Sequence, residues 1–81
     1  MLGSLKRTVL TKAIQKNWSA DETLNFMNEI LDSLEYYEPI SLQELIEQVK
    51  YMQSQKSGIY GGLSTNDITV WLIRLLDLEN S

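Results

Sequence analysis

Apolar residues recur with a helical period along most of this chain. The clearest segments are PISLQELIEQVKYM and LSTNDITVWLIRLLDL, where they return every three or four positions, the spacing of one face of an α-helix. Each segment begins with a serine three residues ahead of an acid, Ser41 before Glu44 and Ser64 before Asp67. This spacing is typical of a capping box, in which the serine hydroxyl accepts a backbone N–H bond from the first helical turn. Both segments are therefore predicted to be helices.

Two further helical stripes precede these segments. The first runs through Leu2, Leu5, Val9 and Ala13, and the second begins after Trp18. A third capping box, formed by a serine at position 19 and a glutamate at 22, indicates where the second stripe starts. Trp18 is predicted to lie in the core or to wedge between helices. The predicted helices are 4–15, 20–37, 41–54 and 65–78, with a glycine-containing loop over 55–63.

This order of elements predicts an all-α fold. We expect about four helices in a small orthogonal or bundle-like arrangement, forming one domain over residues 1–81 with well over half of the residues helical. The apolar faces of the four helices predict a shared core, made of Val9, Met27, Ile30, Leu34, Leu45, Ile46, Val49, Ile68, Trp71, Leu72 and Leu75.

Composition narrows the class of protein. With 43% hydrophobic and 22% charged residues, the chain has the balance of a globular domain rather than a disordered one. Its uninterrupted apolar runs are short, so we expect a soluble, cytoplasmic protein without a membrane segment. A chain of 81 residues buries only a small core, which favours stabilisation by a dimer or a partner.

The chain contains no histidine and no cysteine. Ser-His-Asp and Cys-His machinery and ordinary zinc sites therefore cannot be built from it alone, and we expect no enzyme, no metal and no cofactor. An acidic series suggests paired acid and base carboxylates or an imitation of nucleic acid, but its spacing favours the solvated face of a helix. The series is Asp21, Glu22, Glu29, Asp32, Glu35 and Glu38.

Four of the seven basic residues lie in the N-terminal segment, at Lys6, Arg7, Lys12 and Lys16. One interpretation is the polar, solvated face of a packed helix. The other is a basic arm that contacts a phosphate backbone or an acidic partner.

The last predicted helix has apolar residues on two sides. When Ile68 points inward, Val70 and Ile73 lie on the outer side together with Asn66 and Asp77. Either a partner contacts this outer side, or the N-terminal helix covers it within the same chain. We expect a contact surface with Val70 and Ile73 at its centre.

The segment from Asp21 to Leu78 contains the stretches NEILDSLEYYEPISLQELIEQV and GGLSTNDITVWLIRLLDLE. In their order and helix starts they resemble the three-helix core of the winged helix-turn-helix superfamily, with the last helix in the place of the recognition helix. The resemblance implies DNA binding, with outward residues on that helix of types that contact bases and phosphates. These residues are Thr65, Asn66, Thr69, Val70 and Arg74.

Two features depart from that pattern. The gap before the last helix is about twice that of a tight helix-turn-helix, and we expect no β-hairpin wing after it. The formal net charge of −4 also opposes attraction to a polyanion. We therefore expect a small non-enzymatic regulatory or adaptor protein that acts through protein–protein contacts and self-associates. A helix-turn-helix transcription regulator is the alternative.

Overall fold

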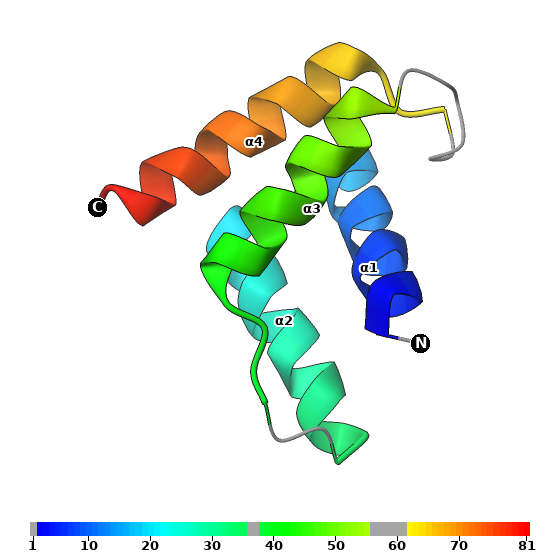
Figure 1. Cartoon of the computed structure of the whole chain (residues 1–81), viewed down its shortest axis with the longest axis vertical. Helices are drawn as coiled ribbons and strands as arrows, with labels where there is room; N and C mark the ends of the chain where they lie inside the picture. Colours follow the sequence, from blue (N-terminus) through cyan, green and yellow to red (C-terminus); the bar gives the residue numbers. More distant parts are fainter. Residues whose placement is uncertain (1, 36–37, 56–61) are drawn as a thin grey trace.

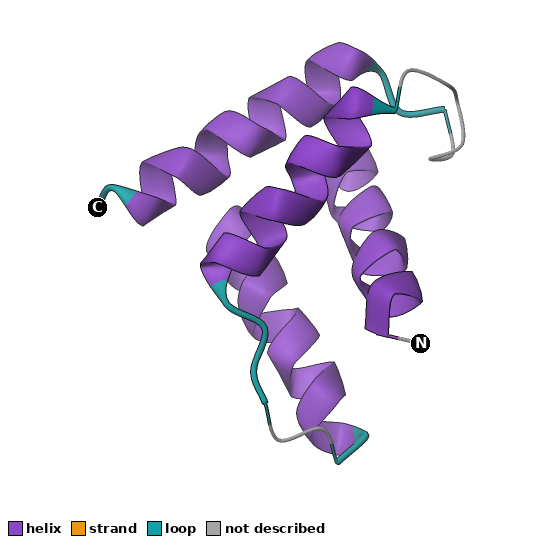
Figure 2. Cartoon of the chain, in the orientation of Figure 1, coloured by secondary structure: helices purple, strands orange, loops and turns teal. Residues whose placement is uncertain are grey.

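A computed structural model describes residues 2–35, 38–55 and 62–81 of the chain. Helices make up 79% of these residues, and none of the described residues lies in a strand. Figure 2 shows this composition directly. The predicted all-α fold is confirmed. The four helices are α1 (Leu2–Lys16), α2 (Ala20–Ser33), α3 (Leu42–Ser54) and α4 (Thr65–Glu79).

The helices cross and splay instead of running parallel as in an up-and-down bundle (Figure 1). α3 and α4 make the most extensive contact, and α1 and α4 each contact all three other helices. In Figure 1 α4 lies along the upper edge of the molecule, with α3, α2 and α1 below it. One side of α4 is therefore packed, while the other is left at the molecular edge.

Serine caps begin α3 and α4 as predicted. The Ser41 hydroxyl accepts a hydrogen bond from the Glu44 backbone N–H at 3.2 Å, and the Ser64 hydroxyl accepts one from the Asp67 N–H at 3.0 Å. The third predicted capping box marks the start of α2 correctly, but its predicted hydrogen bond does not form. Ser19 precedes α2, but its side chain makes no cap hydrogen bond. Its backbone carbonyl instead accepts a hydrogen bond from the hydroxyl of the buried Thr23, at 2.7 Å.

α1 ends in a Schellman motif. Asn17 has φ 56°, a left-handed conformation that asparagine adopts more readily than most residues. The Asn17 N–H donates to the Ile14 carbonyl at 3.3 Å, and the Trp18 N–H donates to the Ala13 carbonyl at 2.9 Å. These bonds satisfy carbonyls that the helix end would leave unpaired, and they direct Trp18 into the junction between α1 and α2.

α2 is shorter than predicted. The sequence predicted a helix to residue 37, but α2 ends at Ser33 and Glu35 takes φ 63°; residues 36 and 37 lie outside the described residues. Leu34 follows the last turn and is 52% exposed. The prediction that Leu34 is a core residue is therefore wrong, because the helix itself ends at Ser33, before that position. Of the predicted loop 55–63, residues 56–61 also lie outside the described residues.

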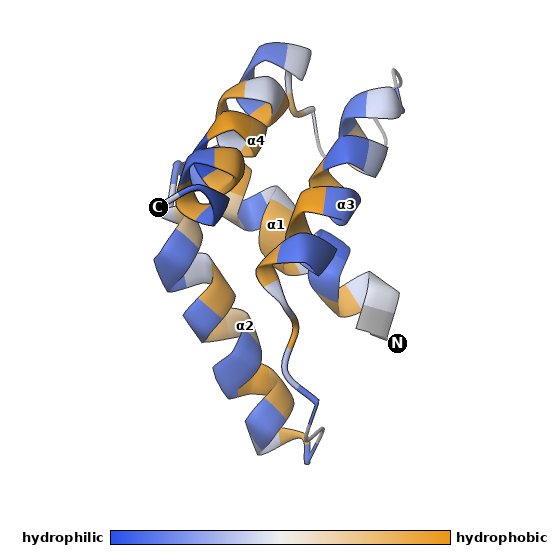
Figure 3. Ribbon diagram, turned by 60° about the vertical axis from the view of Figure 1, so that its left-hand side comes forward, coloured by the Kyte–Doolittle hydropathy of each residue, from blue (hydrophilic) through white to orange (hydrophobic). Residues whose placement is uncertain are grey.

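The core draws on all four helices. Ile30 is only partly buried, and the other predicted core residues apart from Leu34 are buried. In α1, burial centres on Leu10 and Ala13, both at 0% exposure, which moves the buried face slightly round the helix from the predicted stripe. In Figure 3, polar and apolar positions alternate along each helix. Buried apolar residues outside the predicted set are Leu10, Ala13, Ile14, Ala20, Leu31, Ile40 and Met52.

Two side chains fix connections between distant segments. The Asn28 carboxamide accepts the Ile40 N–H at 2.7 Å and donates to the Ile40 carbonyl at 3.2 Å. It thereby anchors the segment before α3 to the middle of α2. The buried Trp71 donates its indole Nε1–H to the Trp18 carbonyl at 3.1 Å, which ties α4 to the junction between α1 and α2.

Candidate functional site

The outer face of α4 consists of Asn66, Val70, Ile73 and Asp77, all of them exposed. Successive helical residues are about 100° apart, so these four positions fall within an arc of about 60° and extend about 16 Å along the axis. The two apolar members, Val70 and Ile73, are 38% and 52% exposed. Here the four residues are called the α4 strip.

Packing of α4 explains why the strip remains uncovered. Ile68, Trp71, Leu72 and Leu75 are buried on the opposite side of the helix, and the other three helices meet α4 there. α1 contacts α4 without covering Val70 or Ile73. The alternative in which the N-terminal helix buries these two residues is therefore wrong.

The two edges of the strip make contacts within the chain. On one edge Thr69 is partly buried, and its hydroxyl accepts a hydrogen bond from the Gln53 side chain of α3 at 2.8 Å. On the other edge the Arg74 guanidinium donates to the Asn17 side chain at the end of α1. These contacts place two of the predicted nucleic-acid contacts in intramolecular roles. Of the predicted recognition-helix contacts, Thr65 and Asn66 stay exposed near the start of α4.

The four N-terminal basic residues do not share one face of α1. Lys12 and Lys16 are one turn apart and exposed, whereas Arg7 is exposed about half a turn round the helix from them. Lys6 is partly buried. Within α1 these charges therefore do not form a single patch.

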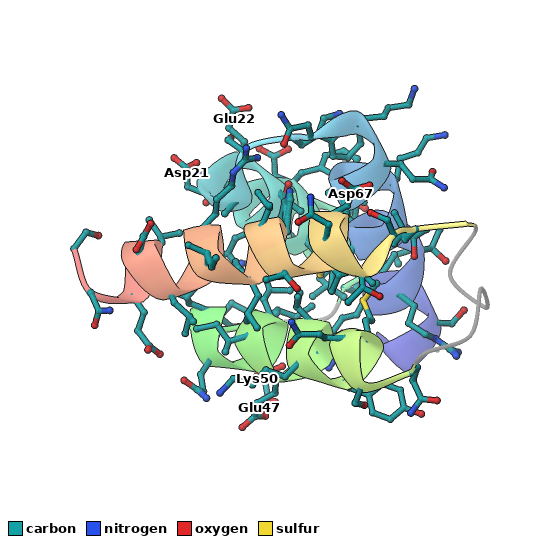
Figure 4. The ribbon with its side chains drawn as sticks, turned by 90° about the horizontal axis from the view of Figure 1, so that it is seen from above. Asp21, Glu22, Glu47, Lys50 and Asp67 are labelled. Carbon is teal, nitrogen blue, oxygen red and sulfur yellow. The ribbon has the colours of Figure 1, made fainter. Side chains whose placement is uncertain are left out.

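The acidic residues behave as solvated side chains. Asp21 and Glu22 lie in the first turn of α2, and in Figure 4 both point away from the body of the molecule. Glu29, Asp32, Glu35 and Glu38 are also exposed. Among the described residues, no group of three or more acidic side chains could hold a metal ion. This arrangement matches the solvated helical face that the spacing favoured.

Two surface hollows lie near the α1–α2 junction. One, of about 420 Å³, is lined by Trp18, Glu22, Thr23 and Phe26. Trp18 and Phe26 meet there edge to face, with ring centroids 6.0 Å apart and an interplanar angle of 84°. Because Trp18 is partly buried and packs against the core, the prediction that it lies in the core or wedges between helices is confirmed. Phe26, at 45% exposure, belongs to this surface pair.

The second hollow, of about 470 Å³, separates the α1–α2 junction from the C-terminal half of α4. Arg74 and Asp77 contribute to it from α4, and Asp21 contributes from α2. The sequence did not predict this hollow, since it joins residues more than fifty positions apart. Its remaining lining residues are Asn17, Ser19, Ala20, Leu78 and Ser81.

No protein-family model matches the chain, and neither a curated protein nor a solved structure matches it significantly. No helix in the part of the chain that the structure describes is long and apolar enough to cross a membrane.

Proposed function

We propose that this chain is a small non-enzymatic regulatory or adaptor protein that acts through protein–protein contacts of the α4 strip. The observation that carries the proposal is the exposure of Val70 and Ile73 on a helix whose opposite side is fully packed. Protein contact surfaces combine an apolar centre with a polar rim, and the strip has this arrangement on a small scale.

The polar members of the strip support the same function. Asn66 and Asp77 flank the apolar pair at either end, which gives a short apolar centre with a polar rim. Asn66 can donate and accept hydrogen bonds, whereas the Asp77 carboxylate accepts them. A partner that contacts this strip therefore meets a defined order of polar, apolar, apolar and polar groups.

The experiment compares two double lysine variants. V70K/I73K places two charges in the strip, whereas the control L34K/Y51K places two charges at residues away from it, just after α2 and on α3, that are 52% and 54% exposed. Both pairs start from exposed side chains, so both variants should keep the helicity and melting midpoint of the parent. The immobilised parent and the two variants are then compared for the proteins that they capture.

We expect V70K/I73K alone to lose captured protein, whether this is a second copy of the chain or a different protein. Equal capture by all three proteins would show that the α4 strip is not the contact surface. A large fall in the melting midpoint of V70K/I73K alone would instead assign the two residues to the core.

The DNA-binding alternative is tested separately. Fluorescence anisotropy with mixed duplex DNA at about 50 and about 200 mM salt measures the phosphate-dependent part of any affinity. Binding that falls steeply with salt would support a helix-turn-helix regulator. No binding at the lower salt concentration would favour the interaction module.

A further inference from the structure

The positions of the strip residues have a symmetry of their own. Val70 and Ile73 lie equally far on either side of the midpoint between Trp71 and Leu72, and Asn66 and Asp77 also lie equally far from it. When two copies of α4 pair antiparallel about a two-fold axis at this midpoint, each Val70 faces the other copy's Ile73. Each Asn66 likewise faces the other copy's Asp77, as a closed two-fold interface requires.

The edge charges have a matching arrangement. Asp67 and Arg74 lie on the same edge of the strip, and Figure 4 shows Asp67 on this exposed side of α4. Within one chain they are seven residues, or about 10 Å, apart along the axis, too far to pair. In the antiparallel pair each Asp67 lies within about 3 Å, along the axis, of the other copy's Arg74.

From this complementarity we infer that the occupant of the α4 strip is a second copy of the chain, paired antiparallel through α4. The inference rests on the proposed function and names its partner. Two Val70–Ile73 contacts form the centre, two Asn66–Asp77 hydrogen bonds close its ends, and two Asp67–Arg74 ion pairs line one edge. Arg74 keeps its Asn17 contact, because a guanidinium has five N–H donors.

A parallel pairing lacks these contacts. In parallel register each strip residue meets its own copy, so Asp77 faces Asp77 and the like charges repel. Asp67 and Arg74 then lie at different heights along the pair. The charge pattern thus favours the antiparallel orientation over the parallel one, although both bring Val70 and Ile73 into the contact.

The size of the interface determines its strength. Pairing one 15-residue helix per copy buries less area than the roughly 1,000 Å² of a stable interface. The dimer is therefore weak and exchanges rapidly. Sedimentation equilibrium from about 10 µM to about 1 mM, at low salt, covers the range in which such a dimer forms.

Charge reversal tests the antiparallel register. Asp67→Arg alone and Arg74→Asp alone each place two like-charge pairs in the dimer, so each variant should self-associate at least fivefold more weakly than the parent. An equimolar mixture of the two restores both ion pairs in every mixed dimer. Because only unlike copies pair well, the apparent association constant of the mixture should return to about half that of the parent. The D67R/R74D double variant should recover the parent's average mass. Circular dichroism melts verify that each variant is folded.

A second set of variants leaves the Asn17 contact intact. Asn66→Asp places a carboxylate opposite each Asp77, which gives two like-charge pairs in the dimer and should weaken self-association, whereas N66D/D77N exchanges the two groups and should restore it. Both positions are exposed, so the fold tolerates these changes.

Two outcomes would overturn the inference. One is a parent that stays monomeric at about 1 mM. The other is self-association that the charge reversals leave unchanged, or that neither the mixture nor the exchanged variants restore. The proposed function is judged independently, because loss of a different captured protein by V70K/I73K would retain the contact surface while rejecting a second copy as its occupant.

Discussion

Replacing Asn28 by alanine tests the connection between α2 and α3. The Asn28 side chain makes two hydrogen bonds to the backbone of Ile40, at 2.7 and 3.2 Å, and Ile40 is only 3% exposed. Asn28→Ala leaves a buried N–H and a buried carbonyl without these partners, and no other residue of the connection is altered.

The expected cost follows from these two backbone groups. Each unpaired buried group costs about 1–3 kcal/mol, and alanine regains roughly 0.5 kcal/mol through its higher helix propensity. Because both hydrogen bonds are only partly buried, we expect a net loss of about 2–4 kcal/mol. A chain of this length has a total stability of roughly 4–12 kcal/mol, so the variant loses a large share of it.

Asn25→Ala is the matched control. Asn25 lies on the same helix one turn earlier and is exposed, so its replacement changes helix propensity alone and should alter stability by less than about 0.5 kcal/mol. Urea unfolding followed at 222 nm measures both variants, and equal slopes show that the unfolded state is unchanged. If the two variants differ by less than about 0.5 kcal/mol, the Asn28 bonds do not hold the connection.

Two further predictions concern the core and the end of α2. Leu45 is 0% exposed, so Leu45→Ala should lower the free energy of unfolding by about 2–5 kcal/mol in the same urea experiment. Leu34 is 52% exposed, so Leu34→Ala should lower it by less than about 1 kcal/mol. Similar losses for the two variants would contradict the assignment of Leu34 to the surface. Glu35→Gly should stabilise the chain by roughly 0.5–1 kcal/mol, because glycine adopts the φ of 63° without the steric cost of a Cβ. A thermal melt of Glu35→Ala, which removes the carboxylate but keeps the Cβ, should show no such gain, and an equal gain would assign the effect to charge.

Local sequence determines where α3 and α4 begin. A serine hydroxyl reaches a backbone N–H three residues ahead, so the bonds of Ser41 and Ser64 depend on almost nothing outside their own turn. The same local logic placed Val70 and Ile73 on the side of α4 opposite Ile68, because the geometry of a helix fixes which positions share a face. Local sequence does not determine whether Val70 and Ile73 remain exposed, because their exposure depends on which parts of α4 the other helices cover.

The end of α2 shows the limit of periodicity. Its apolar stripe continues to Leu34, and no glycine or proline interrupts it before Glu35. The chain nevertheless reverses at Glu35, which takes a left-handed conformation that is uncommon for glutamate. The Asn28 side chain bonds to Ile40, twelve residues further along the chain, and so holds the segment after the reversal against α2. This contact between distant positions is not visible in the periodicity of α2.

Only tertiary structure decided the roles of Thr69 and Arg74. Both lie on the predicted outward side of the last helix, yet Thr69 bonds to Gln53 of α3 and Arg74 bonds to Asn17 after α1. Sequence spacing gives the angle of a side chain about its own helix, whereas its partner depends on which helix packs at that edge. The sequence thus determined the helices and their faces, and the packing of α1 and α3 beside α4 decided which outward residues were left free.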